Sequence, residues 1–590
     1  MSPHTFHIPV MGTGFTLDTP LRVARFGISS VMSIVDDVLV ERVRRHYAEK
    51  LGRPYEPIPA LSPDARARRI TAWCDLVHEV VARQVAELRA QPLTPGTEKA
   101  KYFELLPDDA PAKRAWREVL SVPGGAARTR AEAALDDLIV AGSADVNIMT
   151  KLDRARADRD GRPLGPEHSD AKAALRGFAA SRLESSLVLS AGMNPTLFGL
   201  LEGCPDFYRD AGGRIRKGVI LKVSDFRSAL VQGKFLAKKG IEIREFRIES
   251  GLNCGGHAFA TEGELLGPIL EEFRDRRASF PEAFEPLVRR YYDARGMPYA
   301  GGPRRIRVTV QGGIGTHGEE RRLREHYGVD GTGWASPFLL VPEATALDDA
   351  TRALLARATE ADLYLSDASP LGVPFNNVRG SSSELETDRN IARGAPGSSC
   401  PNGYLAASTE LSEGPLCTAS REYQSAKLRA LGYDAPPPRD CPDPRVQSLY
   451  AKACICHHLG NGALVDLGLA RPDAPVAVCP GPNLAYFGRT YTLRAMVDHI
   501  YGRGESLVPA SRPHMLAKEL AMYVEHLARS RAELAPDDAR GRARLDGFRE
   551  ALQAGVAHCR ALGETAALGD ENLASLAEAA RVQGQRLAQM

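Results

Sequence analysis

Short apolar runs alternate with helix-like segments over the first two thirds of the chain. The runs are "HIPVMGTGF", "ADVNIMT", "SSLVLSAGMNP", "GVILKVSD", "IEIREFRIESG", "RIRVTVQGGIG" and "YGVDGTGWASPFLL". Strands that alternate with helices predict βαβ units and a parallel sheet. Several runs end in Gly, Asn, Ser or His, which is typical of a (β/α)8 barrel with its chemistry after the strand ends. We therefore predict an α/β TIM barrel over about residues 5–380.

Three additions to the barrel are expected from the same pattern. A charged helical insertion covers about residues 38–141 and includes "RITAWCDLVHEVVARQVAELRA". Residues 381–505 are rich in loops and contain six of the ten cysteines, which predicts a cap segment. Residues 510–590 return to amphipathic helix spacing. We expect this C-terminal extension to pack on the barrel or to support a homo-oligomer.

Composition narrows the class of protein. Of the 590 residues, 43% are hydrophobic and 25% charged, which is ordinary for a soluble globular protein. The net charge of +2 and the lack of long basic runs predict no nucleic-acid partner. The N-terminus lacks a signal-peptide pattern, and no apolar run approaches the roughly 18 residues of a membrane span. The expectation is a cytoplasmic protein without a membrane partner.

One histidine follows paired glycines at the end of an expected strand. In "IESGLNCGGHAFATEG", His257 stands directly after Gly255 and Gly256. A glycine pair allows the backbone to approach a ligand closely, and an imidazole exchanges protons near neutral pH. The pattern predicts a proton-transfer residue. The alternative interpretation is a tight turn with a surface histidine, which would have the same sequence pattern.

Glycines also end two successive late strands. "VTVQGGIGT" contains Gly312 and Gly313, and "DGTGWASPF" follows after a helix. Turns of this kind late in a barrel supply backbone N–H donors to a phosphate. Because β-bulges also require glycine, the prediction of a phosphate site rests on the two turns occurring together.

These stretches resemble the nitronate monooxygenase (2-nitropropane dioxygenase) group of FMN-dependent barrels. "QGGIGT", "GVDGTGWASPFLLVPEA" and "SPLGVP" are similar, in order, to the group's Gly-Gly-Ile strand end, its following Gly-rich turn and its barrel-closing segment. "IPVMGTGFTLDTPLRVARFGISS", "ADVNIM" and "ESGLNCGGHAF" are similar to its first strand and helix, its second strand and its Gly-Gly-His segment. The resemblance covers roughly residues 5–380 without the insertion.

The resemblance implies a set of FMN contacts and a role for His257. His257 would lie over the flavin at the substrate face and exchange the proton. Lys222 would face the flavin's ring edge, and Ser250 and Asn253 stand where the group has Gln and Glu. The phosphate turns and the ring contacts implied in this way comprise Gly312, Gly313, Ala335, Ser336, Met11, Gly12, Asn147, Lys222, Ser250, Gly255 and Gly256.

The cysteine segment leaves two interpretations open. An iron–sulfur cluster needs four converging thiolates and tolerates irregular spacing, whereas a zinc ribbon needs two regular Cys-x-x-Cys pairs. Inert buried cysteines would give the same spacing. The candidate ligands of a [4Fe–4S] cluster are Cys417, Cys441, Cys454, Cys456 and Cys479.

Three functions follow from these interpretations. The favoured one is an FMN-dependent oxidoreductase that oxidises a small organic molecule with oxygen as electron acceptor. The second keeps FMN but takes hydride from NAD(P)H and reduces an acyl thioester, as in the enoyl reductases that share the Gly-Gly-His segment. The third is a barrel without flavin that serves as a binding or scaffold protein, because a fold alone does not fix an activity.

Overall fold

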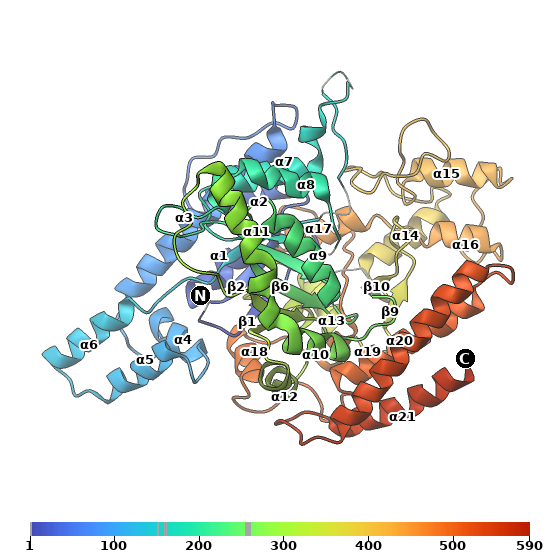
Figure 1. Ribbon diagram of the computed structural model, residues 1–590. Helices are drawn as coiled ribbons and strands as arrows, with labels where there is room; N and C mark the ends of the chain where they lie inside the picture. Colours follow the sequence, from blue (N-terminus) through green and yellow to red (C-terminus); the bar gives the residue numbers. More distant parts are fainter. Residues whose placement is uncertain (1–2, 150–152, 159, 161, 191, 254–260) are drawn as a thin grey trace.

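Eight parallel strands form a closed barrel at the centre of the computed structural model, which describes residues 3–149, 153–158, 160, 162–190, 192–253 and 261–590 (Figure 1). Consecutive strands pair, and the eighth closes the barrel on the first. The predicted (β/α)8 fold is therefore confirmed. The strands are β1 (Phe6–Ile8), β2 (Ser29–Ser33), β3 (Ala144–Ile148), β4 (Ser186–Leu189), β5 (Gly218–Val223), β6 (Ile243–Glu249), β7 (Arg307–Gln311) and β8 (Gly331–Gly333).

Helices connect these strands, and a helical insertion between β2 and β3, which we call the arm, adds five more helices. The arm between β2 and β3 consists of α2 (Asp37–Lys50), α3 (Ala65–Ala90), α4 (Glu98–Leu105), α5 (Pro111–Ser121) and α6 (Ala126–Asp136), and Figure 1 shows its last helices reaching away from the barrel. The remaining barrel helices are α1 (Thr19–Val23), α7 (Asp170–Ala180), α8 (Pro195–Leu200), α9 (Phe226–Ala237), α10 (Leu266–Arg276), α11 (Phe280–Arg295), α12 (His317–Arg321) and α13 (Asp349–Arg357).

Two further parts follow the barrel. An antiparallel hairpin, β9 (Leu363–Ser366) and β10 (Phe375–Val378), leads into α14 (Ser382–Ala392), α15 (Arg421–Ala430), α16 (Pro444–Tyr450), α17 (Ile455–Asp466) and α18 (Leu493–Ile500). The C-terminal helices are α19 (Met515–Ala532), α20 (Ala539–Gly563) and α21 (Leu573–Gln589). "SPLGVP" lies in the turn of the hairpin, so the barrel closes at β8, upstream of that segment. In the described part of the chain, no helix has the length and apolar character that crossing a bilayer requires.

The alternating residues of β6 explain how the barrel is filled. Phe246 points outward, and its ring packs at a tilt against that of Phe280 in the helical layer. Glu245 and Arg247 point inward, where Arg247 donates to Glu245 at 2.8 Å. On β8, an added Cβ at Gly333 would lie 2.6 Å from the Cβ of Gln311 on β7. The side chains of Gln311 on β7 and His7 on β1 thus require glycine at position 333 of β8.

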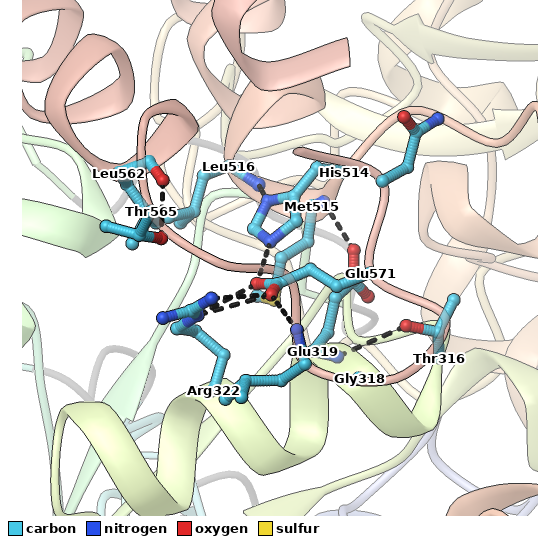
Figure 2. A network of polar contacts seen from close by, with 12 residues as sticks. Thr316, Gly318, Glu319, Arg322, His514, Met515, Leu516, Leu562, Thr565 and Glu571 are labelled. Atoms are coloured by element: carbon cyan, nitrogen blue, oxygen red, sulfur yellow. Dashed lines mark hydrogen bonds and ion pairs between the residues drawn. The ribbon is translucent and has the colours of Figure 1, made fainter. Parts of the chain in front are cut away.

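A buried polar network joins the C-terminal helices to α12 (Figure 2). Glu571 has a fully buried side chain and accepts hydrogen bonds from Arg322 at 2.8 Å and from His514 at 3.1 Å. Beside it, Glu319 accepts from Arg512 and from the Met515 N–H, both at 2.7 Å. The extension is therefore bonded to the helix that follows β7.

We predict that Glu571→Gln destabilises the whole chain by about 3 kcal/mol, because Arg322 then loses its buried carboxylate partner. Urea unfolding followed by circular dichroism measures this loss. Glu578→Gln is the control, since the ion pair of Glu578 with Arg581 is solvent-exposed and should contribute little to stability. Equal effects of the two substitutions would contradict a supporting role for the network.

The difference in stability between the wild type and Glu571→Gln should depend on pH. Burial alone raises the pKa of Glu571, but its bonds to His514 and Arg322 bring it down from 4.5 to about 2. A carboxylate whose pKa is lowered on folding stabilises the protein above its unfolded pKa and loses that effect as the pH falls through its folded pKa. The stability difference between the wild type and Glu571→Gln should therefore shrink between pH 4.5 and about 2.

Candidate active site at the mouth of the barrel

A polar cluster occupies the carboxyl ends of β5, β6 and β7, and we call its members Lys222, Glu249, Asn253 and Gln311 the mouth cluster. Glu249 is its hub. Its Oε1 accepts from Lys222 Nζ at 3.2 Å, from Asn253 Nδ2 at 2.6 Å and from Gln311 Nε2 at 2.8 Å. Active sites of TIM barrels lie at this end of the strands. Every second residue at the end of β6 is charged, namely Glu245, Arg247 and Glu249, and this alternation is the signal for the hub in the sequence. The predicted site residues did not include Glu249.

A second charged layer supports the mouth cluster from below. Thr309 donates to Glu245 at 2.6 Å, and Arg247 forms an ion pair with it. Burial alone raises the pKa of Glu245, but the positive charges of Arg247 and Arg307 bring it down to about 2. Burial and then Arg247 lower the pKa of His7 to about 3. His7, which contacts Gln311 at 3.4 Å, is therefore neutral, and Glu245 and His7 keep fixed protonation states near neutral pH.

The turn after β7 has the geometry of an anion-binding loop. Gly312 and Gly313 have φ values of +103° and +79°, which side chains other than glycine rarely adopt. A Cβ at Gly312 would lie 2.9 Å from the backbone of Asn253, and one at Gly313 2.5 Å from Leu252. The N–H groups of both glycines donate no hydrogen bond to any residue that the structure describes. The turn thus presents two free donors beside the mouth cluster.

The turn after β8 carries the second pair of phosphate candidates. Ala335 and Ser336 are buried, and the Oγ of Ser336 accepts the Gly481 N–H at 2.9 Å. The hydroxyl proton of Ser336 and the N–H of Ala335 find no acceptor within the described ranges. A segment of the cap therefore covers this turn without using its donors.

The candidates for ring contacts occupy different surroundings. Met11 is fully buried, and its N–H donates to Thr16 at 3.2 Å. Gly12 has a φ of +55°, and a Cβ there would meet the ring of Phe15 at 2.7 Å. Asn147, the residue before the last of β3, has a buried Oδ1 without a partner among the described residues, and the same holds for the Oδ1 of Asn253. Buried acceptors normally have donors, so each of these atoms is a candidate contact for a polar ligand.

Ser250 faces the C-terminal extension. Its hydroxyl donates to Glu519 of α19 at 2.9 Å, and the Gly251 N–H donates to the same oxygen at 2.8 Å. The other carboxylate oxygen of Glu519 accepts the Leu266 N–H at 2.9 Å. Burial raises the pKa of Glu519. One carboxylate thus holds the chain on both sides of residues 254–260.

His257, Gly255 and Gly256 lie outside the described residues, so the roles predicted for them stay predictions. The described residues that Glu519 holds, Gly251 and Leu266, precede and follow residues 254–260 in the chain. The extension is therefore part of the site's support, a role for which its amphipathic sequence gave no signal.

The cysteine candidates separate into groups. Cys441 packs in a small apolar cluster with Val446 and Tyr450, and Cys479 is buried in the main core. Cys417, Cys454 and Cys456 lie together with Cys400, which the sequence analysis did not select.

Comparisons with known proteins add little to this geometry. No family model and no curated protein matches the chain. Among solved structures, it is similar to FabK from Thermotoga maritima, with 12% identity, coverage of 65% of this chain and 82% of that chain, and a TM-score of 0.30. The enoyl reductase domain of MlnA from the macrolactin biosynthesis cluster of Bacillus amyloliquefaciens matches with 13% identity, coverage of 65% and 87%, and a TM-score of 0.37.

A third similar structure is nitroalkane oxidase from Streptomyces ansochromogenes, with 10% identity, coverage of 85% of this chain and 95% of that chain, and a TM-score of 0.35. Likenesses this distant carry no argument about activity. The barrel itself is established by its strand pairing.

We expect Glu519→Gln to loosen the segment that carries His257. The amide has only one acceptor oxygen for the three donors that Glu519 now serves, and a buried donor without a partner costs about 1–3 kcal/mol. Hydrogen exchange should therefore speed up at Gly251 and Leu266 relative to the wild type. Glu525→Gln, an exposed position on the same helix, is the control. Unchanged exchange in Glu519→Gln would show that the segment is held by other contacts.

Proposed function

We propose that this protein is an FMN-dependent oxidoreductase that oxidises a small organic substrate and uses oxygen as electron acceptor, as the nitronate monooxygenase group does. The observation that carries the proposal is the pair of adjacent turns after β7 and β8. Both present N–H groups without partners in the described structure, and the mouth cluster beside the turn after β7 contains a buried acceptor, the Oδ1 of Asn253, that has no partner there either.

The residues present fit FMN in their chemistry. Gly312, Gly313 and Ser336 offer N–H and hydroxyl donors, which a phosphate requires. Asn147 and Lys222 would serve the polar edge of the ring, Asn147 with its unpartnered oxygen and Lys222 with its charge. When bound, FMN takes an electron pair from the substrate and is reoxidised by oxygen.

The protein's own groups would bind the substrate and move the proton. Lys222 is held at 3.2 Å from Glu249, so its charge is fixed in place and partly balanced. Glu249 accepts three hydrogen bonds through one oxygen, which the described partners therefore already engage. That arrangement leaves His257, on the adjoining segment, as the group to exchange a proton near neutral pH.

An anaerobic visible spectrum tests the cofactor and the electron donor in one experiment. Protein purified without air should show flavin bands that bleach with dithionite and with substrate. Rapid bleaching by NADPH or NADH would instead support the enoyl reductase alternative. A colourless protein that takes up no added FMN would overturn the proposal and leave a binding or scaffold role.

Gly312→Ala should weaken FMN binding at least roughly ten-fold, which corresponds to about 1.4 kcal/mol. The added Cβ would lie 2.9 Å from the backbone of Asn253, at a φ that alanine rarely adopts. Fluorescence titration of the apoprotein with FMN measures the change. Gly328→Ala is the matched control, because Gly328 also has a positive φ but its Cβ would enter open space. Equal losses in both variants would point to backbone strain alone.

His257→Ala should bind FMN normally but slow turnover by about 10²- to 10⁴-fold, the usual contribution of general acid–base catalysis. Stopped-flow reduction by substrate isolates the affected step. His46→Ala, in helix α2 of the arm, provides the histidine control. Normal turnover in His257→Ala would assign the proton to another group.

A further inference from the structure

Four cysteines from three separate segments of the cap converge on one place. Cys417, Cys454 and Cys456 are buried and Cys400 is half-buried. We call Cys400, Cys417, Cys454 and Cys456 the cysteine quartet. Its members lie up to 56 positions apart in the chain, and no regular spacing connects them.

Backbone contacts hold the three segments together independently of the thiols. The Ser398 N–H donates to the carbonyl of Ala419 at 3.0 Å, which sets the segment of Cys400 beside that of Cys417. The side chain of Gln424 donates to the carbonyls of Thr418 and Lys452, both at 3.4 Å. Gln424 thus ties the segment of Cys417 to the segment that leads into Cys454.

Within the quartet, the thiols form two pairs. The side chain of Cys400 neighbours that of Cys417, and the side chain of Cys454 neighbours that of Cys456. Cys417 also lies near Cys454, and Cys456 near Cys400 and Cys417, so the two pairs are close together. Among the described residues, however, no three Cys, His, Asp or Glu side chains are close enough together to hold a single metal ion. The quartet therefore has a two-plus-two arrangement.

Backbone N–H groups point at three of the four sulfur atoms. Gly403 donates to Cys400, Ala419 to Cys417 and His457 to Cys454. Cys454 is also the N-cap residue of the 12-residue helix α17, whose dipole favours a negative charge there. Hydrogen bonds to cysteine sulfurs are a feature of iron–sulfur sites, where they tune the reduction potential.

The quartet lies at the same end of the barrel as the mouth cluster. Thr13, in the loop after β1, donates to the carbonyl of Cys456 at 3.5 Å. Asn402 and Tyr404, which follow Cys400, donate to Asp36 after β2 at 3.1 Å and 2.9 Å. Loops of the barrel mouth thus contact both halves of the quartet.

We propose that Cys400, Cys417, Cys454 and Cys456 bind an iron–sulfur cluster. A zinc ion would need all four sulfurs at one centre, whereas two pairs can serve different irons of a polynuclear cluster. Each thiol would give its proton to solvent and bind as thiolate. Relative to the ligands expected from the sequence, Cys400 is added and Cys441, which packs in a separate apolar cluster, is excluded. The proposal does not depend on FMN binding.

Iron and acid-labile sulfide analysis of the full chain tests the site. The protein is purified without air and, if it is empty, reconstituted with ferrous iron and sulfide. About two or about four irons per chain, with equal sulfide, are expected, and electron paramagnetic resonance after dithionite reduction distinguishes the two cluster types. Zinc without sulfide, or no iron after reconstitution, would overturn the proposal. Flavin released by heat is measured separately, so failure of the FMN proposal remains distinguishable.

Variants test the ligand set. Cys400→Ser and Cys454→Ser should each lower the iron content at least several-fold. Cys441→Ser, a buried cysteine of the same cap in a separate apolar cluster, should retain it, and thermal melting confirms that all three variants fold. Loss of iron in Cys441→Ser with full iron in Cys400→Ser would contradict the proposed ligands.

Discussion

Glu245 and Arg247 are buried side by side on the barrel axis, where either charge alone would cost several kcal/mol. Each side chain needs the other, and together they fill space that an ordinary barrel gives to branched apolar residues. Val31, Val188 and Ile220, on β2, β4 and β5, supply apolar filling, and Ile220 is the strand partner of Glu245. Glu249 follows Glu245 and Arg247 on the same face of β6, so the mouth cluster continues the charged layer along this strand.

This constraint explains why the additions to the barrel take part in the site. The strand ends at the barrel mouth are charged and are followed by glycine turns, so little apolar surface is present to fix the loops. Polar side chains of the cap and of the C-terminal extension fix them by hydrogen bonds. Arg512 donates to the Gly313 carbonyl and Asn483 to that of Ile314, both at 2.7 Å. Because C=O and N–H of a trans peptide point in opposite directions, Arg512 fixes the direction of the Ile314 N–H. The cap and the extension thereby set the geometry of the glycine turn.

The strand order, the glycine turns and the three additions were readable in the sequence, because each rests on local periodicity or on residues that special backbone angles demand. The mouth cluster was readable only in part. Lys222 and Asn253 were noticed as strand-end residues, but Glu249 gained its importance from three partners on other strands. Glu519 was not predictable, since its role depends on where α19 docks.

The cysteines show more clearly how far a site can be predicted from the sequence. Cys454 and Cys456 stand two positions apart, so their nearness could be read directly, whereas Cys441 and Cys400 looked alike as isolated cysteines in loops. The choice between them depends on Ser398 and Gln424, whose bonds place the segment of Cys400 beside that of Cys417 and leave Cys441 in a separate apolar cluster. A ligand set made from three segments is a property of the tertiary fold. Its position against the loops after β1 and β2 likewise follows from the docking of α17, which no spacing rule in the sequence encodes.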